Sequence, residues 1–149
     1  MQMVAAFVFS AFLALSAGFS QAADKSLVEI VTKTGVRAFS VEMAVTPDQL
    51  SRGLMFRTEL PPTAGMLFVF MDEAERSFWM YRTKIPLDIL WLNANHQIVE
   101  ISADTPPCPG ESRDDCPSFG GNVPSQFVLE IGAGQAAAHG LKVGDRLNF

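Results

Sequence analysis

Three charged residues interrupt one of the most apolar stretches of the chain. The segment FWMYRTKIPLDILWLN carries Arg82, Lys84 and Asp88 among aromatic and aliphatic side chains. Successive side chains of an extended strand point to opposite faces, so Asp88 shares a face with Leu90 and Leu92. A buried carboxylate without a partner is costly. The pattern therefore predicts that Asp88 is held by an arginine or by backbone N–H groups.

Arginine is the natural partner for such a carboxylate, because its planar guanidinium can donate two parallel hydrogen bonds. The candidates are Arg52, Arg57 and Arg82. Three roles follow for this group: a structural contact that ties a helical region to the sheet, recognition of a polar or anionic ligand, or acid–base catalysis. The structural contact is the interpretation we favour. The candidate ligand-binding residues are Arg52, Arg57, Trp79, Thr83 and Asp88.

The aromatic residues of the same segment suggest a second kind of site. Trp79 and Tyr81 alternate with Phe78 and Met80, so one of the two pairs can face solvent. An exposed pair would offer a stacking surface for a sugar. Packing in the core is the usual role of such residues and is the one we expect.

Methionines suggest a third kind of site, because thioethers bind Cu(I). Four of them fall between the expected helix and the following strands: Met55, Met66, Met71 and Met80. Each adjoins apolar residues and none has a neighbouring Cys or His, so we expect them to fill the core. Copper handling stays the weaker alternative, and we expect no metal site.

Standard catalytic signatures are missing from the sequence. It contains no G-x-S-x-G, no H-E-x-x-H and no glycine-rich phosphate loop, and its two histidines, His96 and His139, stand apart. We therefore expect a non-enzymatic protein without a cofactor. The enzymatic alternative is a hydrolase or isomerase that uses the carboxylate of Asp88.

Two cysteines, Cys108 and Cys116, stand close together in a loop rich in proline and glycine. In an exported chain such a pair indicates a disulfide. The spacing is longer than that of a C-x-x-C redox motif, and a metal site would need further ligands. Closing so short a ring contributes roughly 2.5 kcal/mol of stability.

The N-terminus has the features of a signal peptide. The uncharged run MVAAFVFSAFLALSAGF is followed by small residues around Ala22, the expected cleavage site. The alternative is an N-terminal membrane anchor, although the run is shorter than the about 20 residues of a spanning helix. We therefore expect residues 1–22 to be removed and the protein to be periplasmic or secreted, without stable membrane insertion.

Length and charge limit the remaining possibilities. With 149 residues, the chain has room for one domain, which we place at residues 23–149. Its formal net charge of -5 leaves no basic patch of the kind that nucleic-acid binding requires. We expect no nucleic-acid partner.

Short strands separated by turns dominate the pattern. LVEIVT and VRAFSVEMAVT flank a hairpin turn at Gly35, and GMLFVF, IPLDILWLN and QFVLEI are further strands. Thr46 and Gln49 form a capping box that begins a short helix over residues 47–56. One helical turn is expected near residues 135–139. This pattern predicts a mostly-β domain, a sandwich or a barrel.

Several of these segments together resemble one family. RGLMFR, GMLFVF, FWMYRTKIPLDILWLN, the cysteine loop, FVLEIGAG and GLKVGDRL occur in the order found in the prokaryotic domain of unknown function number 192. The resemblance covers roughly residues 27–149 and implies a mostly-β domain, often preceded by a signal or membrane segment, without an established activity. The family usually has Asn where this chain has Arg82, and often Asp where it has Asn93.

The hypothesis that combines these observations is an exported, non-enzymatic binding module. Its ligand would be a small polar molecule, a glycan or a component of the cell envelope. We expect the binding surface to be formed by RGLMFR and FWMYRTKIPLD.

Overall fold

The computed structural model describes residues 25–32 and 35–149, so the predicted signal peptide at residues 1–22 lies outside it. Seven strands form one sheet in the order β6-β5-β8-β3-β2-β1-β9. In chain order they are β1 (Lys25–Thr32), β2 (Gly35–Ala44), β3 (Ala64–Ala74), β5 (Leu87–Leu92), β6 (Ile98–Thr105), β8 (Ser125–Gly132) and β9 (Arg146–Asn148). Among the described residues, no helix has the length and apolar character needed to span a membrane.

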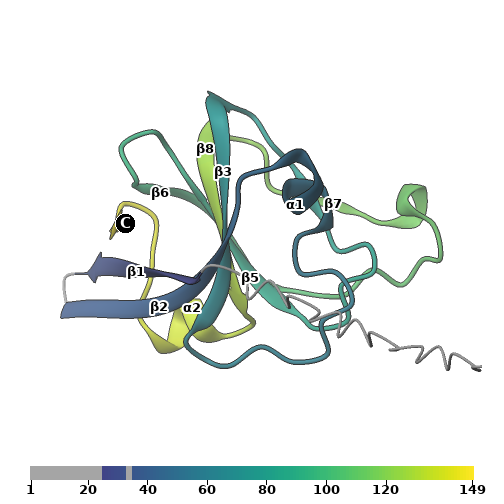
Figure 1. The fold of residues 1–149 in the computed structure, drawn as a ribbon, viewed down its shortest axis with the longest axis horizontal. Helices are drawn as coiled ribbons and strands as arrows, with labels where there is room; N and C mark the ends of the chain where they lie inside the picture. The colour runs from purple at the N-terminus through teal and green to yellow at the C-terminus, as the bar shows by residue number, and fades with distance from the viewer. Residues whose placement is uncertain (1–24, 33–34) are drawn as a thin grey trace, which may run out of the picture.

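The sheet curls until its two edges meet at one end (Figure 1). There the N–H of Ile98 donates to the carbonyl of Asp145 at 2.9 Å, and the N–H of Leu147 donates to the carbonyl of His96 at 2.9 Å. The mostly-β, barrel-like prediction is therefore confirmed. The predicted hairpin is also present, since β1 and β2 pair antiparallel up to Thr32 and Gly35.

Two hydrophobic clusters occupy the two faces of this sheet. The interior cluster contains Val28, Ile30, Phe39, Val41, Leu67, Leu90, Leu92, Ile98, Phe127, Leu129, Ile131, Ala136, Leu141 and Leu147. The second, which we call the cavity-side cluster, contains Ala44, Leu54, Met66, Phe68, Met80, Leu87, Ile89, Trp91 and Val128. Residues of β3, β5 and β8 alternate between the two clusters, so these central strands are buried on both faces.

Different elements cover the two faces. The short helix α2 (Gln135–Ala138) places Ala136 in the interior cluster. The helix α1 (Pro47–Arg52) and a two-stranded ribbon of β4 (Phe78–Trp79) and β7 (Ser118–Phe119) lie on the other face (Figure 1). The segment RSFWMY forms a strand of only two residues, Phe78–Trp79, because it pairs with β7 alone.

The start of α1 is as predicted, and its end is earlier than predicted. The Thr46 side chain accepts from the Gln49 N–H, and the Gln49 side chain accepts from the Thr46 N–H, which completes the capping box. The helix ends at Arg52, before the expected residue 56, because Gly53 has φ of 47° and leaves the helical conformation.

Candidate functional site

A cavity of about 370 Å³ lies between α1 and the β4–β7 ribbon, above the cavity-side cluster. Its walls come from α1 and the turn after it, from β3, from the segment 76–83, from the cysteine loop and from β8. The lining residues are Leu50, Ser51, Arg52, Gly53, Leu54, Met55, Phe68, Phe70, Arg76, Ser77, Phe78, Trp79, Tyr81, Thr83, Arg113 and Glu130. A cavity of this size is at the lower end of the range for small-ligand sites.

Gly53 lets the chain pass close to the floor of this cavity. A Cβ atom at position 53 would lie 3.1 Å from Cζ of Phe68 and 3.8 Å from Oε2 of Glu130. Its φ of 47° is also one that other residues rarely adopt. Gly53 therefore brings the backbone that follows α1 close to Phe68 and Glu130.

Aromatic side chains form the opposite wall. Phe78 makes edge-to-face contacts with Phe68, at 5.1 Å between ring centroids, and with Trp91, at 5.9 Å. Trp79 points away from this packed group and is 38 % exposed. Met80 is buried, whereas the exposure of Trp79 contradicts the expectation of core packing. Phe78, Trp79 and Tyr81 all line the cavity.

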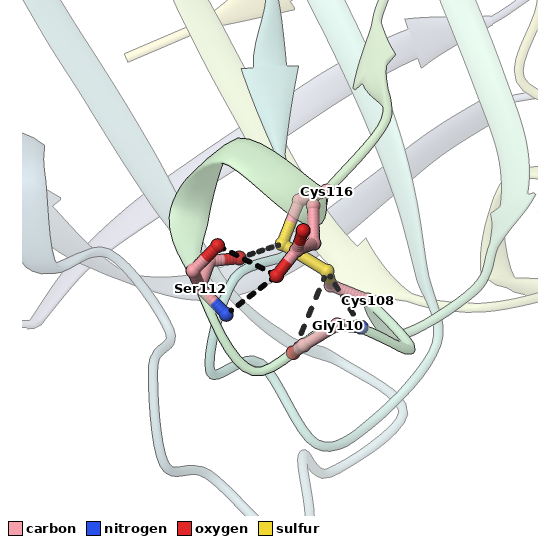
Figure 2. Close-up of a disulfide and its surroundings, with 5 residues drawn as sticks. Cys108, Gly110, Ser112 and Cys116 are labelled. Carbon is pink, nitrogen blue, oxygen red and sulfur yellow. Dashed lines mark hydrogen bonds between the residues drawn. A yellow bond between two sulfur atoms is a disulfide. The ribbon is translucent and has the colours of Figure 1, made fainter.

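The cysteine loop contributes one edge of the site. Cys108 and Cys116 form the predicted disulfide, which closes a loop around the 3-10 helix η1 (Arg113–Asp115) (Figure 2). Within this loop, both the N–H and the hydroxyl of Ser112 donate to the carboxylate of Asp115. The guanidinium of Arg113 lies over the ring of Trp79, 4.7 Å from its centroid. The disulfide loop thus places a cation at the cavity.

Glu130 is the most unusual residue of the site. It lies on the central strand β8, only 5 % exposed, and its side chain reaches the cavity. No group among the described residues forms a hydrogen bond or an ion pair with its carboxyl. Burial alone raises its pKa from 4.5 to about 8. At neutral pH the free protein therefore holds this carboxyl mostly in its uncharged form.

Glu130 was not among the residues singled out from the sequence. In QFVLEI, Phe127, Leu129 and Ile131 alternate with Gln126, Val128 and Glu130, and the first three belong to the interior cluster. Glu130 therefore points to the other face of the sheet. That face is also buried, because β8 lies between β3 and β5 and is covered by α1 and the ribbon. One residue of the sequence could have indicated that this face is buried: Val128 is apolar and lies on the same face as Glu130.

Asp88 is buried as predicted, and its partners are backbone N–H groups, the alternative to the arginine that we favoured. One carboxylate oxygen accepts from the N–H of Asp104 at 2.8 Å, and the other accepts from the N–H of Ala136 at 2.7 Å. The prediction of an arginine partner is therefore wrong within the described structure. Asp88 is 1 % exposed and lies on the interior face, away from the cavity, so it has no access to a substrate.

Two of the three arginine candidates have partners of their own. Arg57 pairs with Glu42 at 2.6 Å and does not line the cavity. Arg82 has φ of 56° and lies over the rings of Phe56 and Tyr81. Asn tolerates this left-handed conformation better than Arg does, which gives a physical reason for the family's usual Asn at this turn.

Three of the five predicted ligand-binding residues thus line the cavity, namely Arg52, Trp79 and Thr83, and two, Arg57 and Asp88, do not. The methionines do not form a group. Met66 and Met80 are in the core and Met55 lines the cavity, while Met71 is 99 % exposed, contrary to the expectation of core packing. Met71 lies where β3 departs from its pairing with β8. The described residues contain no cluster of three metal-ligating His, Cys, Asp or Glu side chains.

Comparison with solved structures supports both the fold and the family. The chain is 33 % identical to a protein from Sinorhizobium meliloti 1021, provisionally described as a transcription regulator, with a TM-score of 0.76 over 84 % of this chain and 93 % of that one. It is 34 % identical to a protein of unknown function from Novosphingobium aromaticivorans DSM 12444, with a TM-score of 0.76 over 84 % of this chain and 85 % of that one. Comparison with curated proteins finds no match.

The family model named DUF192, with the description "Uncharacterized ACR", matches residues 29–149. This range contains every element of the cavity wall, from α1 to β8. The chain belongs to the DUF192 family.

Proposed function

We propose that this protein is a non-enzymatic binding module and that the cavity beneath α1 receives a small polar ligand. The observation that carries the proposal is the side chain of Glu130, which is buried in the cavity wall without a partner among the described residues. The carboxyl opens onto the cavity and receives no hydrogen bond from the described residues, so it is available to a bound molecule. A ligand that hydrogen-bonds to it would supply the missing partner.

The remaining lining residues fit this role. Ligand sites are mainly apolar, with a few polar groups that fix orientation. Here five aromatic residues surround the hydroxyl of Thr83, the carboxyl of Glu130 and three guanidinium groups. A glycan could stack on Trp79 and Tyr81, but a volume of about 370 Å³ favours a single small molecule over a polymer.

We further propose that the protein acts outside the cytoplasm and does not bind nucleic acid. The disulfide is consistent with an oxidising compartment. The net charge of -5 argues against nucleic-acid binding. Fractionation of cells that express the full chain tests the first point, because the periplasmic or secreted form should be shorter by about the length of a signal peptide.

The binding proposal can be tested by NMR with a set of neutral, cationic and anionic fragments. Trp79 lines the cavity, whereas Trp91 is buried, so the indole N–H of Trp79 should shift more than that of Trp91. The variant Ser51→Trp places a large side chain over the cavity from an exposed helical position and should abolish the shift. The matched variant Asp48→Trp, on the same helix away from the cavity, should not. The proposal fails if no fragment shifts Trp79, or if Ser51→Trp binds as well as the wild type.

A second candidate function is acid–base catalysis by Glu130. A carboxyl whose pKa is about 8 is suited to exchange protons near neutral pH. The same fragments can be screened for chemical change by NMR over days. Turnover that is lost in Glu130→Gln while binding persists would favour catalysis over binding alone.

A further inference from the structure

Basic residues outnumber acidic ones in the cavity wall, whereas acidic residues outnumber basic ones in the whole chain. The sequence has 16 acidic and 11 basic residues. The cavity wall has three arginines, Arg52, Arg76 and Arg113, and one acidic residue, Glu130. An acidic protein with a locally basic cavity attracts anions to that site.

The three arginines are not equivalent. Arg76 is held in place: its guanidinium donates to the carbonyls of Ala74 and Ser125, pairs with Asp72 and lies over the ring of Phe70. The guanidinium groups of Arg52 and Arg113 donate no hydrogen bond to any described residue. The N–H donors of Arg52, and those of Arg113 where it lies over Trp79, are therefore available to an anionic group at the cavity.

Glu130 complements these arginines when it is uncharged. In that form its carboxyl both donates and accepts a hydrogen bond, and it does not repel an anion. The charged and titratable groups that share the cavity with it are Arg52, Arg76, Tyr81 and Arg113, and its neighbours on β3 and β5, Met66 and Ile89, carry no charge. The cavity thus has a cationic mouth, aromatic walls and a polar, uncharged floor.

We propose that the ligand is a small organic anion with an aromatic or aliphatic body. Its anionic group binds Arg52 and Arg113 at the mouth, its body packs against the aromatic wall, and a polar atom at its far end hydrogen-bonds with Glu130. This inference rests on the proposed binding function and specifies the chemical class of the ligand.

Three probes with the same ring and different charges test the proposal: 4-hydroxyphenylacetate, 2-(4-hydroxyphenyl)ethanol and tyramine. Calorimetric titration at pH 7 should show the acetate binding about tenfold more tightly than the alcohol, with tyramine weakest. The variant Arg52→Gln should bring the acetate to the affinity of the alcohol. The matched variant Arg146→Gln removes an exposed arginine outside the cavity and should bind like the wild type.

The dependence on pH is the second arm of this test. Between pH 7 and pH 9 the Glu130 carboxyl loses its proton, so binding of the acetate should weaken severalfold in the wild type and stay constant in Glu130→Gln. Tighter binding of tyramine, strengthening toward pH 9, would overturn the proposal in favour of a cationic ligand. Equal binding of acetate and alcohol would also overturn it.

Failure of this inference can be separated from failure of the binding function. If none of the three probes binds while other fragments shift Trp79, the cavity is a binding site and the ligand class is wrong. If no fragment of any charge shifts Trp79, the binding function itself is wrong.

Discussion

Two buried carboxyl groups on adjacent strands have opposite environments. On β5 and β8, Asp88 lies opposite Ile131, and Ile89 lies opposite Glu130, so the two acids are one position apart in the register. Alternation sends Asp88 to the interior face and Glu130 to the cavity face. Both are almost fully buried.

Their partners distinguish them. Asp88 accepts one backbone N–H on each oxygen and so ties the start of α2 to the end of β6. Glu130 has no described partner, and burial raises its pKa to about 8. Burial of an acid therefore does not by itself indicate function. In this molecule the acid whose oxygens both accept backbone N–H groups is a structural contact, and the acid without a partner among the described residues lines the candidate site.

The largest effect is expected for Asp88→Ala. This change leaves the N–H of Ala136 without its acceptor in a buried region and that of Asp104 without its acceptor in a partly buried one, and it should lower the free energy of unfolding by about 2 to 4 kcal/mol. Urea denaturation measures it. Asp114→Ala, at an exposed position, is the control and should be nearly neutral. A small loss for Asp88→Ala would contradict the structural role.

Glu130→Gln should instead raise the free energy of unfolding. Because the folded-state pKa of Glu130 is raised, the folded state keeps a proton that the unfolded state has lost, and stability falls as pH rises from 4.5 to about 8. The full rise in pKa corresponds to a loss of at most about 5 kcal/mol in the free energy of unfolding. Relaxation of the protein around the charge lowers the expected loss to about 2 to 3 kcal/mol at pH 8.

The measurement for Glu130→Gln is denaturation as a function of pH. The variant should be more stable than the wild type at pH 8 and nearly equal to it at pH 4.5. If the variant and the wild type are equally stable at both pH values, Glu130 has a partner, and the proposed difference between Glu130 and Asp88 is wrong.

Removing the disulfide should affect the cavity side of the molecule more than the side of Asp88. The double variant Cys108→Ser and Cys116→Ser should lose up to about 2.5 kcal/mol of stability. It should also weaken binding of 4-hydroxyphenylacetate, because Arg113 would no longer be held over Trp79. Reduced wild-type protein is the matched control. If neither the double variant nor the reduced wild type binds the acetate more weakly, Arg113 does not take part in binding.

The smallest effect is expected for Arg82→Asn. Asn adopts φ of 56° at lower cost than Arg, but the change removes two contacts with aromatic rings. A net gain of about 0.5 kcal/mol is expected from thermal denaturation, without a change in ligand affinity, because Arg82 does not line the cavity. A clear loss of ligand affinity in Arg82→Asn would show that this turn belongs to the binding site.

The sequence predicted the local features of this structure well. The capping box of α1, the alternating faces of β5 and the disulfide all follow from spacing and residue type. Each depends on residues close together in the chain, where geometry leaves few choices. The residues of RGLMFR and FWMYRT that line the cavity were also predicted to share one surface.

What the sequence did not predict depends on contacts between distant residues. Asp88 needed a partner, and an arginine was the chemically obvious choice, but the chain brings the backbone of Asp104 and Ala136 to it instead. Glu130 gave no signal because a glutamate in a strand is ordinarily exposed. Only the position of β8 between β3 and β5, under α1, makes it a buried acid.

The contrast between the two acids is tested most directly by carbon-13 NMR titration of the Glu130 side-chain carboxyl in the intact protein. The structure predicts a pKa of about 8 in the free protein, rising further when an anion occupies the cavity, because the anion disfavours the charged form. A pKa near 4.5, unchanged by ligands, would show that Glu130 is paired or solvated and would contradict its assignment to the site.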